Sequence, residues 1–321
     1  MDEVLPRLDN NMKENFIELL DPSIIEEYPK LVLDVDYLSS MFGKELGWHY
    51  LVDLVWILKT LEETGISKQS TLIDAGAGNG LLQFLLAEQG FNVISVDFSD
   101  IRVPYYAKFL YPMRKIPGNI TKFDHEYNLH VKSSNQVWIK LKSIWLRMFK
   151  KRFNPLFLFR SLWISLIGKR RTGKIMVYRE DMANMKSIKT DSVDAVVSVS
   201  AIEHVSINKI PKVIAEFDRV IKPDGFIAIT TSASSKADWY HDPSKGWCYS
   251  FPSIIRFMGL PKNTSNNYER YHNISKKYLQ SQELKGRLSS HYFVSGNNGM
   301  PWGVWDPKYI PVGIFKRAIE I

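Results

Sequence analysis

Apolar residues recur with two different periods along the chain, and the change comes near residue 70. Over residues 44–63 they return every three to four positions, which is typical of a helix with one buried face, and Gly65 follows where that helix would end. Beyond residue 70, short and almost fully apolar runs alternate with helix-like segments. Runs that are apolar on both faces are typical of parallel strands inside a sheet. The alternation therefore predicts a doubly wound α/β sheet with helices on both faces.

The predicted elements divide the chain into a cap, a sheet domain and an insertion. Strands are expected at 71–73, 91–96, 175–178, 193–199 and 226–231. Helices are expected at 81–89 and 207–221. Residues 291–294 and 309–316 are predicted to add a final antiparallel pair. The first forty residues read as short helical pieces joined by prolines. We therefore expect a helical N-terminal cap at 1–66 and a main domain at 67–321, interrupted by an insertion at 101–173.

A glycine-rich turn follows the first predicted strand. Gly76, Gly78 and Gly80 alternate with other residues, so the backbone turns tightly there and lets a ligand approach closely. The dinucleotide fingerprint requires glycine at position 81, where this chain has Leu81, and no Gly-Lys-Ser/Thr phosphate loop follows. Asp97 ends the next strand, and its carboxylate is suited to accept hydrogen bonds from both hydroxyls of a ribose.

These motifs resemble those of class I S-adenosylmethionine-dependent methyltransferases. They occur in the expected order within residues 71–100 and 175–231, as Asp74-Ala-Gly-Ala-Gly-Asn-Gly, Val96-Asp97, Asp181-Met182, Asp194 to His204, and Arg219 to Gly225. The resemblance is greatest to the small-molecule-type branch, whose fourth strand ends in a Glu-His pair, here Glu203-His204. Asp224 departs from the family, which usually has glycine at that place. The resemblance implies a Rossmann-like, mostly parallel, seven-stranded sheet and S-adenosyl-L-methionine as the cofactor.

The same resemblance implies a set of cofactor-binding residues. They are Asp74, Gly76, Gly78, Gly80, Asp97, Phe98, Asp181, Met182 and Ser200. Asp74 and the three glycines are expected to hold the methionine moiety, and Asp97 the ribose hydroxyls. Phe98 is expected beside the adenine. Asp181 would accept a hydrogen bond from the adenine amino group, and Met182 would donate its backbone N–H.

Histidines are the candidates for the chemistry. An enzyme that transfers a methyl group from a sulfonium mainly aligns donor and nucleophile, and proximity alone is worth roughly 7–11 kcal/mol. A hydroxyl acceptor also needs a general base, for which histidine suits neutral pH. His204 with its neighbour Glu203 follows the fourth strand, and His241, which Asp242 would orient, follows the fifth. A structural role is the alternative for each, and for His49 helix packing is favoured over closing above the cofactor.

Composition and cysteine content exclude several classes of protein. Apolar residues make up 45% and charged residues 24%, as in folded globular chains. The single Cys248 excludes an internal disulfide and a cysteine-rich zinc site, and it lies outside the motifs of cytosine methyltransferases. No metal-ligand spacing and no Asn-Pro-Pro-Tyr-like tetrapeptide occur, the latter arguing against adenine-amino DNA methyltransferases. Charged residues near the start and the lack of a long apolar run favour a cytoplasmic protein.

One stretch carries most of the positive charge. Between Glu126 and Glu180 there are 13 lysines and arginines and no carboxylate, although the whole chain has a net charge of only +8. A helix over 137–151 would place basic residues on one face and tryptophans on the other. Residues 156–168 are apolar with a single charge and precede three basic residues. This pattern favours a monotopic helix at an anionic membrane surface, with a lid over the sheet and an RNA-binding track as alternatives.

The leading hypothesis is an O-methyltransferase. Its acceptor would be a saccharide, a lipid-linked glycan or another amphiphilic small molecule, presented at the inner membrane face through residues 132–171. The alternatives are an RNA methyltransferase, which the basic stretch motivates, and a non-catalytic S-adenosylmethionine-binding protein.

Overall fold

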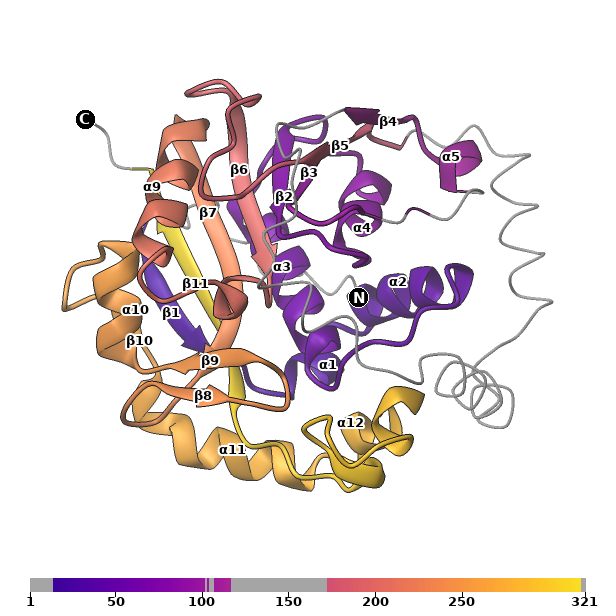
Figure 1. Ribbon diagram of the computed structural model, residues 1–321, viewed down its shortest axis with the longest axis vertical. Coiled ribbons are helices and arrows are strands. Elements are labelled where there is room, and N and C mark those ends of the chain that lie inside the picture. The colour runs from indigo at the N-terminus through magenta and orange to yellow at the C-terminus, as the bar shows by residue number, and fades with distance from the viewer. Residues whose placement is uncertain (1–13, 102, 104–106, 117–171, 319–321) are drawn as a thin grey trace, which may run out of the picture.

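A mostly parallel sheet runs through the molecule, with helices on both of its faces (Figure 1). The computed structural model describes residues 14–101, 103, 107–116 and 172–318. Within them eleven strands form the sheet: β1 (Phe16–Leu19), β2 (Thr71–Ala75), β3 (Asn92–Asp97), β4 (Met113–Ile116), β5 (Ile175–Arg179), β6 (Val193–Val199), β7 (Ile221–Ala233), β8 (Trp239–His241), β9 (Gly246–Tyr249), β10 (Ser265–Asn266) and β11 (Ile310–Arg317).

The order of the strands is β10-β1-β11-β7-β6-β2-β3-β5-β4, and the β8–β9 hairpin attaches to β7 through β9. From β4 to β7 every neighbouring pair is parallel, whereas β11 is antiparallel to both β7 and β1. The predicted α/β class and the mostly parallel sheet are thus confirmed. The expected number of strands was too low, because short strands extend the sheet at both edges.

The helices cover the sheet in two groups. They are α1 (Ile24–Glu27), α2 (Pro29–Met41), α3 (Tyr50–Thr64), α4 (Leu82–Glu88), α5 (Ala107–Leu110), α9 (Ile210–Val220), α10 (Phe251–Met258), α11 (Tyr271–Gln280) and α12 (Gln282–Gly286). Contacts join α2 with α3 and α4, and α9 with α10. Helix α3 ends as predicted, since Gly65 takes the left-handed conformation that favours glycine at this position. It begins six residues later than its apolar pattern suggests, at Tyr50.

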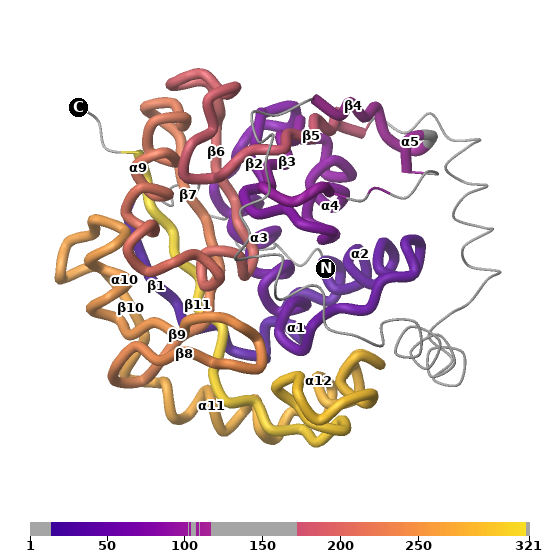
Figure 2. The backbone as a smooth tube through the Cα atoms, viewed as in Figure 1, coloured from indigo at the N-terminus to yellow at the C-terminus, as the bar shows by residue number. Residues whose placement is uncertain are grey.

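The N-terminal segment is not purely helical, which corrects the expectation for its secondary structure. Strand β1 lies between β11 and β10, so the two ends of the described chain run side by side in the sheet (Figure 2). Ile17 and Leu19 are buried, while Phe16 and Glu18 are half-buried, which is the alternation of a strand. The Glu18 carboxylate accepts a hydrogen bond from Trp56 Nε1 at 2.9 Å. The domain boundary at residue 66 stays a prediction.

The predicted strand at 291–294 is also wrong. Residues Ser290–Phe293 form a 3-10 turn, η3, whose first residue donates its backbone N–H and hydroxyl to the Glu45 carboxylate. Strand β11, which was expected to pair with this segment, pairs with β7 and β1 instead.

Most of the insertion, including the predicted helices at 137–151 and 156–168, lies outside the described residues. Its described start adds β4 parallel to β5 at the edge of the sheet. In the part of the chain that the structure describes, no helix has the length and apolar character needed to cross a bilayer.

Candidate functional site

The chain changes the direction in which it adds strands to the sheet at β2, and the candidate site lies at this point. Strand β3 lies on one side of β2 and β6 on the other, and all three strands run in the same direction. Connections that leave a strand in opposite directions open a crevice at its carboxyl end, where α/β proteins bind their ligands. The glycine turn that follows β2 lies at this point.

The three glycines of the turn serve different purposes. Gly76 has φ +73°, and a Cβ there would lie 2.4 Å from Ala201 Cβ, so this glycine is required by packing against the end of β6. Gly78 has φ +47°, but the atom nearest to its Cβ position is Asp97 Oδ2, 3.9 Å away. A side chain at Gly78 would therefore fill open space beside the Asp97 carboxylate, as expected of a cradle for a ligand. At Gly80 a Cβ would lie 3.0 Å from the Ala77 carbonyl oxygen.

Asp74 supplies an unsatisfied acceptor at the start of the turn. Its side chain is buried, and Oδ2 has no hydrogen-bond partner among the described residues. Burial, with the nearby Asp97 carboxylate, raises the pKa of Asp74 to about 8. A buried carboxylate oxygen without a donor is costly, so it favours a cationic ligand at this position. The ammonium group of the S-adenosylmethionine methionine moiety fits this requirement.

The ribose and adenine residues lie at the ends of β3 and β5. Asp97 accepts hydrogen bonds from the backbone N–H of Gly78 at 2.9 Å and of Ser99 at 2.7 Å. Asp97 Oδ1 also accepts from the Ser99 hydroxyl, so about one of the four lone-pair directions of the carboxylate, on Oδ2, is left to accept from a ribose hydroxyl. Phe98 follows directly and is half-buried, and Asp181 is exposed, with Oδ1 accepting from Ala183 N at 2.9 Å. Met182 is half-buried against the same core. These residues fit a nucleoside, and their individual roles stay predictions.

Ser200 links the cofactor crevice to α3. It follows β6, is buried and has φ +46°, a conformation that serine rarely adopts and that costs of order 1–3 kcal/mol. Its Oγ lies 3.2 Å from Asp53 Oδ2. Backbone strain of this kind is frequent at functional sites. The strained turn directs the serine hydroxyl toward the buried first turn of α3.

A buried histidine–aspartate pair lies on that turn. Asp53 Oδ2 is 2.6 Å from His49 Nδ1, and both side chains are buried. Because a carboxylate only accepts, Nδ1 must donate, which leaves Nε2 as the proton-accepting nitrogen of the neutral ring. Nε2 is 3.5 Å from the hydroxyl of Tyr309, the residue before β11. Sequence reasoning favoured a packing role for His49 and missed Asp53 and Tyr309. The available signal was the charged Asp53 among the apolar residues of α3.

His241 approaches the same tyrosine from the β8–β9 hairpin. Its ring centroid is 5.3 Å from that of Tyr309, and the Tyr309 ring is 5.6 Å from His49. Burial lowers the pKa of His241. Ser244 Oγ lies 2.7 Å from His241 Nδ1, while the Asp242 carboxylate accepts from Lys245 Nζ at 2.6 Å and acts on the His241 ring through its charge, so its orienting role stays a prediction. The half-buried Lys245 competes for Asp242 in a way that the sequence order does not reveal.

The Glu203-His204 pair is divided between the interior and the surface. Glu203 is buried in the 3-10 turn η1 (Ile202–His204), and its Oε2 accepts from Thr231 Oγ1 at 3.1 Å. Burial raises the pKa of Glu203, although the His204 and His49 rings favour its charged form. His204 is exposed, with Nδ1 2.8 Å from the Lys245 carbonyl oxygen. The structure thus brings Glu203 together with the His49–Asp53 pair and leaves His204 at the rim.

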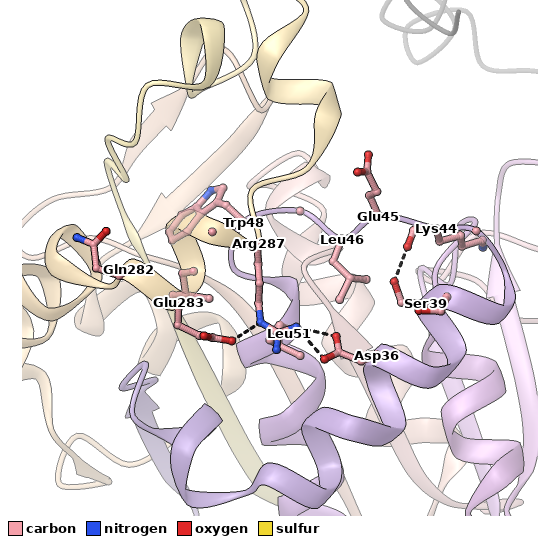
Figure 3. Close-up of a pocket in the computed structure, with 15 residues that line it drawn as sticks. Asp36, Ser39, Lys44, Glu45, Leu46, Trp48, Leu51, Gln282, Glu283 and Arg287 are labelled. Atoms are coloured by element: carbon pink, nitrogen blue, oxygen red, sulfur yellow. Dashed lines mark hydrogen bonds and ion pairs between the residues drawn. The ribbon is translucent and has the colours of Figure 1, made fainter. Parts of the chain in front are cut away.

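A cavity of about 550 Å³ opens between the end of α2 and α12 (Figure 3). Its lining combines charged and apolar side chains, among them Asp36, Lys44, Trp48, Leu51, Glu283 and Arg287. Arg287 crosses the cavity wall, donating through Nη1 to Asp36 Oδ1 at 2.7 Å and through Nε to Glu283 Oε1 at 2.6 Å. The Trp48 ring lies 4.7 Å from His49 and 5.2 Å from Tyr309, which makes it the shared wall between the cavity and the buried pair.

Within residues 14–101, 103, 107–116 and 172–318, no group of three or more His, Cys, Asp or Glu side chains is arranged to hold a metal ion. Cys248 is buried in β9, and burial raises the pKa of its thiol.

Comparisons with known proteins give one family match and several similar solved structures. Residues 164–229 match a family model described as a methyltransferase domain. No curated protein matches the chain. Among solved structures, a putative sarcosine dimethylglycine methyltransferase from Galdieria sulphuraria is 17% identical, with 83% of this chain and 84% of that chain covered and a TM-score of 0.41.

Two further solved structures have similar scores. The 1,6-didemethyltoxoflavin-N1-methyltransferase from Burkholderia thailandensis is 13% identical, over 92% of this chain and 90% of that one, with a TM-score of 0.44. Geranyl diphosphate C-methyltransferase from Streptomyces coelicolor A3(2) is 13% identical, over 99% and 100%, with a TM-score of 0.44. At these values no substrate is inferred from them. The methyltransferase-domain match over residues 164–229, together with the mostly parallel sheet, its reversed last strand and the glycine turn at the switch point, supports a class I S-adenosylmethionine-dependent methyltransferase.

Proposed function

We propose that this methyltransferase methylates a hydroxyl group of a hydroxyl-rich or amphiphilic small molecule, such as a saccharide or a lipid-linked glycan. The observation that carries the proposal is the buried His49–Asp53 pair at the carboxyl edge of the sheet, next to Ser200 at the end of β6. An imidazole held in one tautomer is what removal of a hydroxyl proton requires.

S-adenosylmethionine, when bound, supplies an electrophilic methyl group. The residues of the chain have to align the acceptor oxygen and remove its proton. Asp53 fixes the His49 ring so that Nε2 can accept that proton, and the resulting imidazolium lies 2.6 Å from the Asp53 carboxylate. A general base of this kind typically contributes 10²- to 10⁴-fold to the rate.

His241 and Glu203 complete the proposed acceptor site. His241 Nδ1 is 2.7 Å from the Ser244 hydroxyl, and its lowered pKa favours the neutral ring, so His241 is suited to hydrogen-bond the acceptor hydroxyl. Glu203, with its raised pKa, can donate or accept a hydrogen bond there. His204 is exposed and is assigned to the rim of the site rather than to proton transfer.

The cavity beside Trp48 supports a hydroxyl-bearing acceptor. Its volume of about 550 Å³ falls within the roughly 300–1,000 Å³ usual for small-molecule sites. Asp36, Glu283 and Arg287 supply acceptors and donors on one wall, and Trp48 and Leu51 supply apolar surface on another. Such a mixture suits a molecule that carries both hydroxyl groups and apolar carbon.

A membrane-bound acceptor is part of the same proposal. Residues 132–171, outside the described part of the chain, contain clustered lysines and arginines and no carboxylate, which suits an anionic lipid surface. Co-sedimentation with phosphatidylglycerol vesicles is expected at low salt and should weaken at high salt. Equal binding to neutral phosphatidylcholine vesicles, or none to either, would remove the membrane from the proposal.

The test of the function is transfer of labelled methyl from S-adenosylmethionine into a fractionated extract of the source cells. Label is expected in the glycan or lipid fraction, and NMR of the product should show an O-methyl group. The Asp97→Ala variant serves as the blank, since it should not bind the cofactor. Label that appears in RNA, or on nitrogen or carbon, would overturn the proposed acceptor.

A further inference from the structure

Lys44 reaches from the loop between α2 and α3 to the glycine turn. Its Nζ donates hydrogen bonds to the carbonyl oxygens of Asn79 and Gly80, the latter at 3.3 Å. The backbone of Lys44 is itself held, because Ser39 Oγ donates to its carbonyl oxygen. Lys44 also lines the cavity between α2 and α12, as Figure 3 shows. Its ammonium group is thus held at the border between the cofactor crevice and the cavity.

The charge of Lys44 is poorly compensated. Burial lowers the pKa of its ammonium group to about 8, and no carboxylate offsets this. None of the ion pairs between described residues includes Lys44. The nearby acids have other partners: Glu45 accepts from Ser290, and Asp36 and Glu283 accept from Arg287. A half-buried cation whose hydrogen bonds among the described residues go to carbonyl oxygens favours an anionic ligand.

The glycine turn indicates which anion would bind. Asp74, at the start of the turn, has an unpartnered buried oxygen that a cationic donor would satisfy, and Lys44 places a cation at the end of the same turn. The Asp74 carboxyl group on one side of the turn matches the ammonium group of an α-amino acid, and the Lys44 ammonium group on the other side matches its carboxylate. We propose that Lys44 binds the carboxylate of the methionine moiety of the cofactor, opposite Asp74.

This assignment concerns the cofactor and does not depend on the acceptor. Two ligands separate it from a structural role of Lys44. S-adenosylhomocysteine carries the amino-acid group, whereas 5′-methylthioadenosine has the same nucleoside and thioether without it. A contact to the carboxylate contributes to the binding of the first ligand only.

The experiment is isothermal titration calorimetry of both ligands with the full chain. Lys44→Met is expected to weaken S-adenosylhomocysteine binding by about 10- to 100-fold, the range for a charge-assisted hydrogen bond, and to leave 5′-methylthioadenosine binding unchanged. Lys44→Arg should retain most of the affinity, and the exposed Lys262→Met is the matched control. Lys44→Gln repeats the test with a smaller change of shape, in case the methionine variant does not fold.

Two outcomes would overturn the proposal. Unchanged affinity for S-adenosylhomocysteine in both neutral variants would show that the carboxylate binds elsewhere. An equal loss for both ligands would show that Lys44 only holds the glycine turn in place. Neither outcome bears on O-methylation, so the failure of this inference and that of the proposed function can be told apart.

Discussion

Replacing Asp74 by asparagine should stabilise the cofactor-free protein while abolishing cofactor binding. In the unfolded chain an aspartate has a pKa of about 3.9, whereas burial beside Asp97 raises the pKa of folded Asp74 to about 8. Between these values the folded state keeps a proton that the unfolded state has released, so the free energy of unfolding falls as pH rises. The slope is about 1.4 kcal/mol per pH unit, or on the order of 5 kcal/mol between pH 4 and pH 8. Asparagine does not ionise, so the variant does not lose this part of its free energy of unfolding as pH rises.

The assay is urea unfolding of the wild type and of Asp74→Asn without cofactor at pH 5, 6, 7 and 8. The difference between the two proteins cancels groups that titrate equally in both, and it should grow in favour of the variant up to about pH 8. Calorimetry with S-adenosylhomocysteine should show the opposite preference, with binding only to the wild type. A difference in stability that does not change with pH would refute the assignment of a buried, protonated Asp74.

Three further predictions follow from particular contacts. Asp53→Asn should lower kcat by about 10²- to 10⁴-fold without changing S-adenosylhomocysteine affinity, because it frees the His49 tautomer; unchanged kcat in a methyl-transfer assay would contradict this. Gly76→Ala should lower the melting temperature, since its Cβ would lie 2.4 Å from Ala201 Cβ, whereas Gly78→Ala should mainly weaken cofactor binding in calorimetry. Ile17→Ala should cost about 2–5 kcal/mol in urea unfolding, because Ile17 is 1% exposed; a loss below 1 kcal/mol would show that β1 is dispensable.

The central strands could be predicted because parallel buried strands leave a strong pattern. Residues 193–199 were predicted as a strand and form β6 with the same bounds. Strand β1 is only four residues long, and its alternation is too short to stand out beside the prolines that follow. The segment at 291–294 has an apolar, aromatic composition suited to a strand, but the bond from Ser290 to Glu45 holds it as a turn. That contact spans 245 residues, and no local pattern encodes it.

The candidate site divides in the same way. Residues that belong to a contiguous motif, such as Asp74 and Asp97, were predicted and lie together at the end of the sheet. The His49–Asp53 pair depends on where α3 begins, which the apolar period placed too early. The proposed role of Lys44 depends on its contact with the glycine turn, 35 and 36 residues away in the sequence. Side chains brought together by tertiary contacts between separate segments carry no signature in the order of residues.

The position of β1 has a consequence for how the polypeptide folds during synthesis. Phe16 pairs with Phe315 and Leu19 with Val312, so β1 has its antiparallel partner only after residues 310–317 have left the ribosome. Until then the edge of β7 that later binds β11 is an open template for unwanted pairing. Pairing of β1 with β11 is therefore a late, non-local step, and a truncated product that lacks β11 would leave β1 without its antiparallel partner.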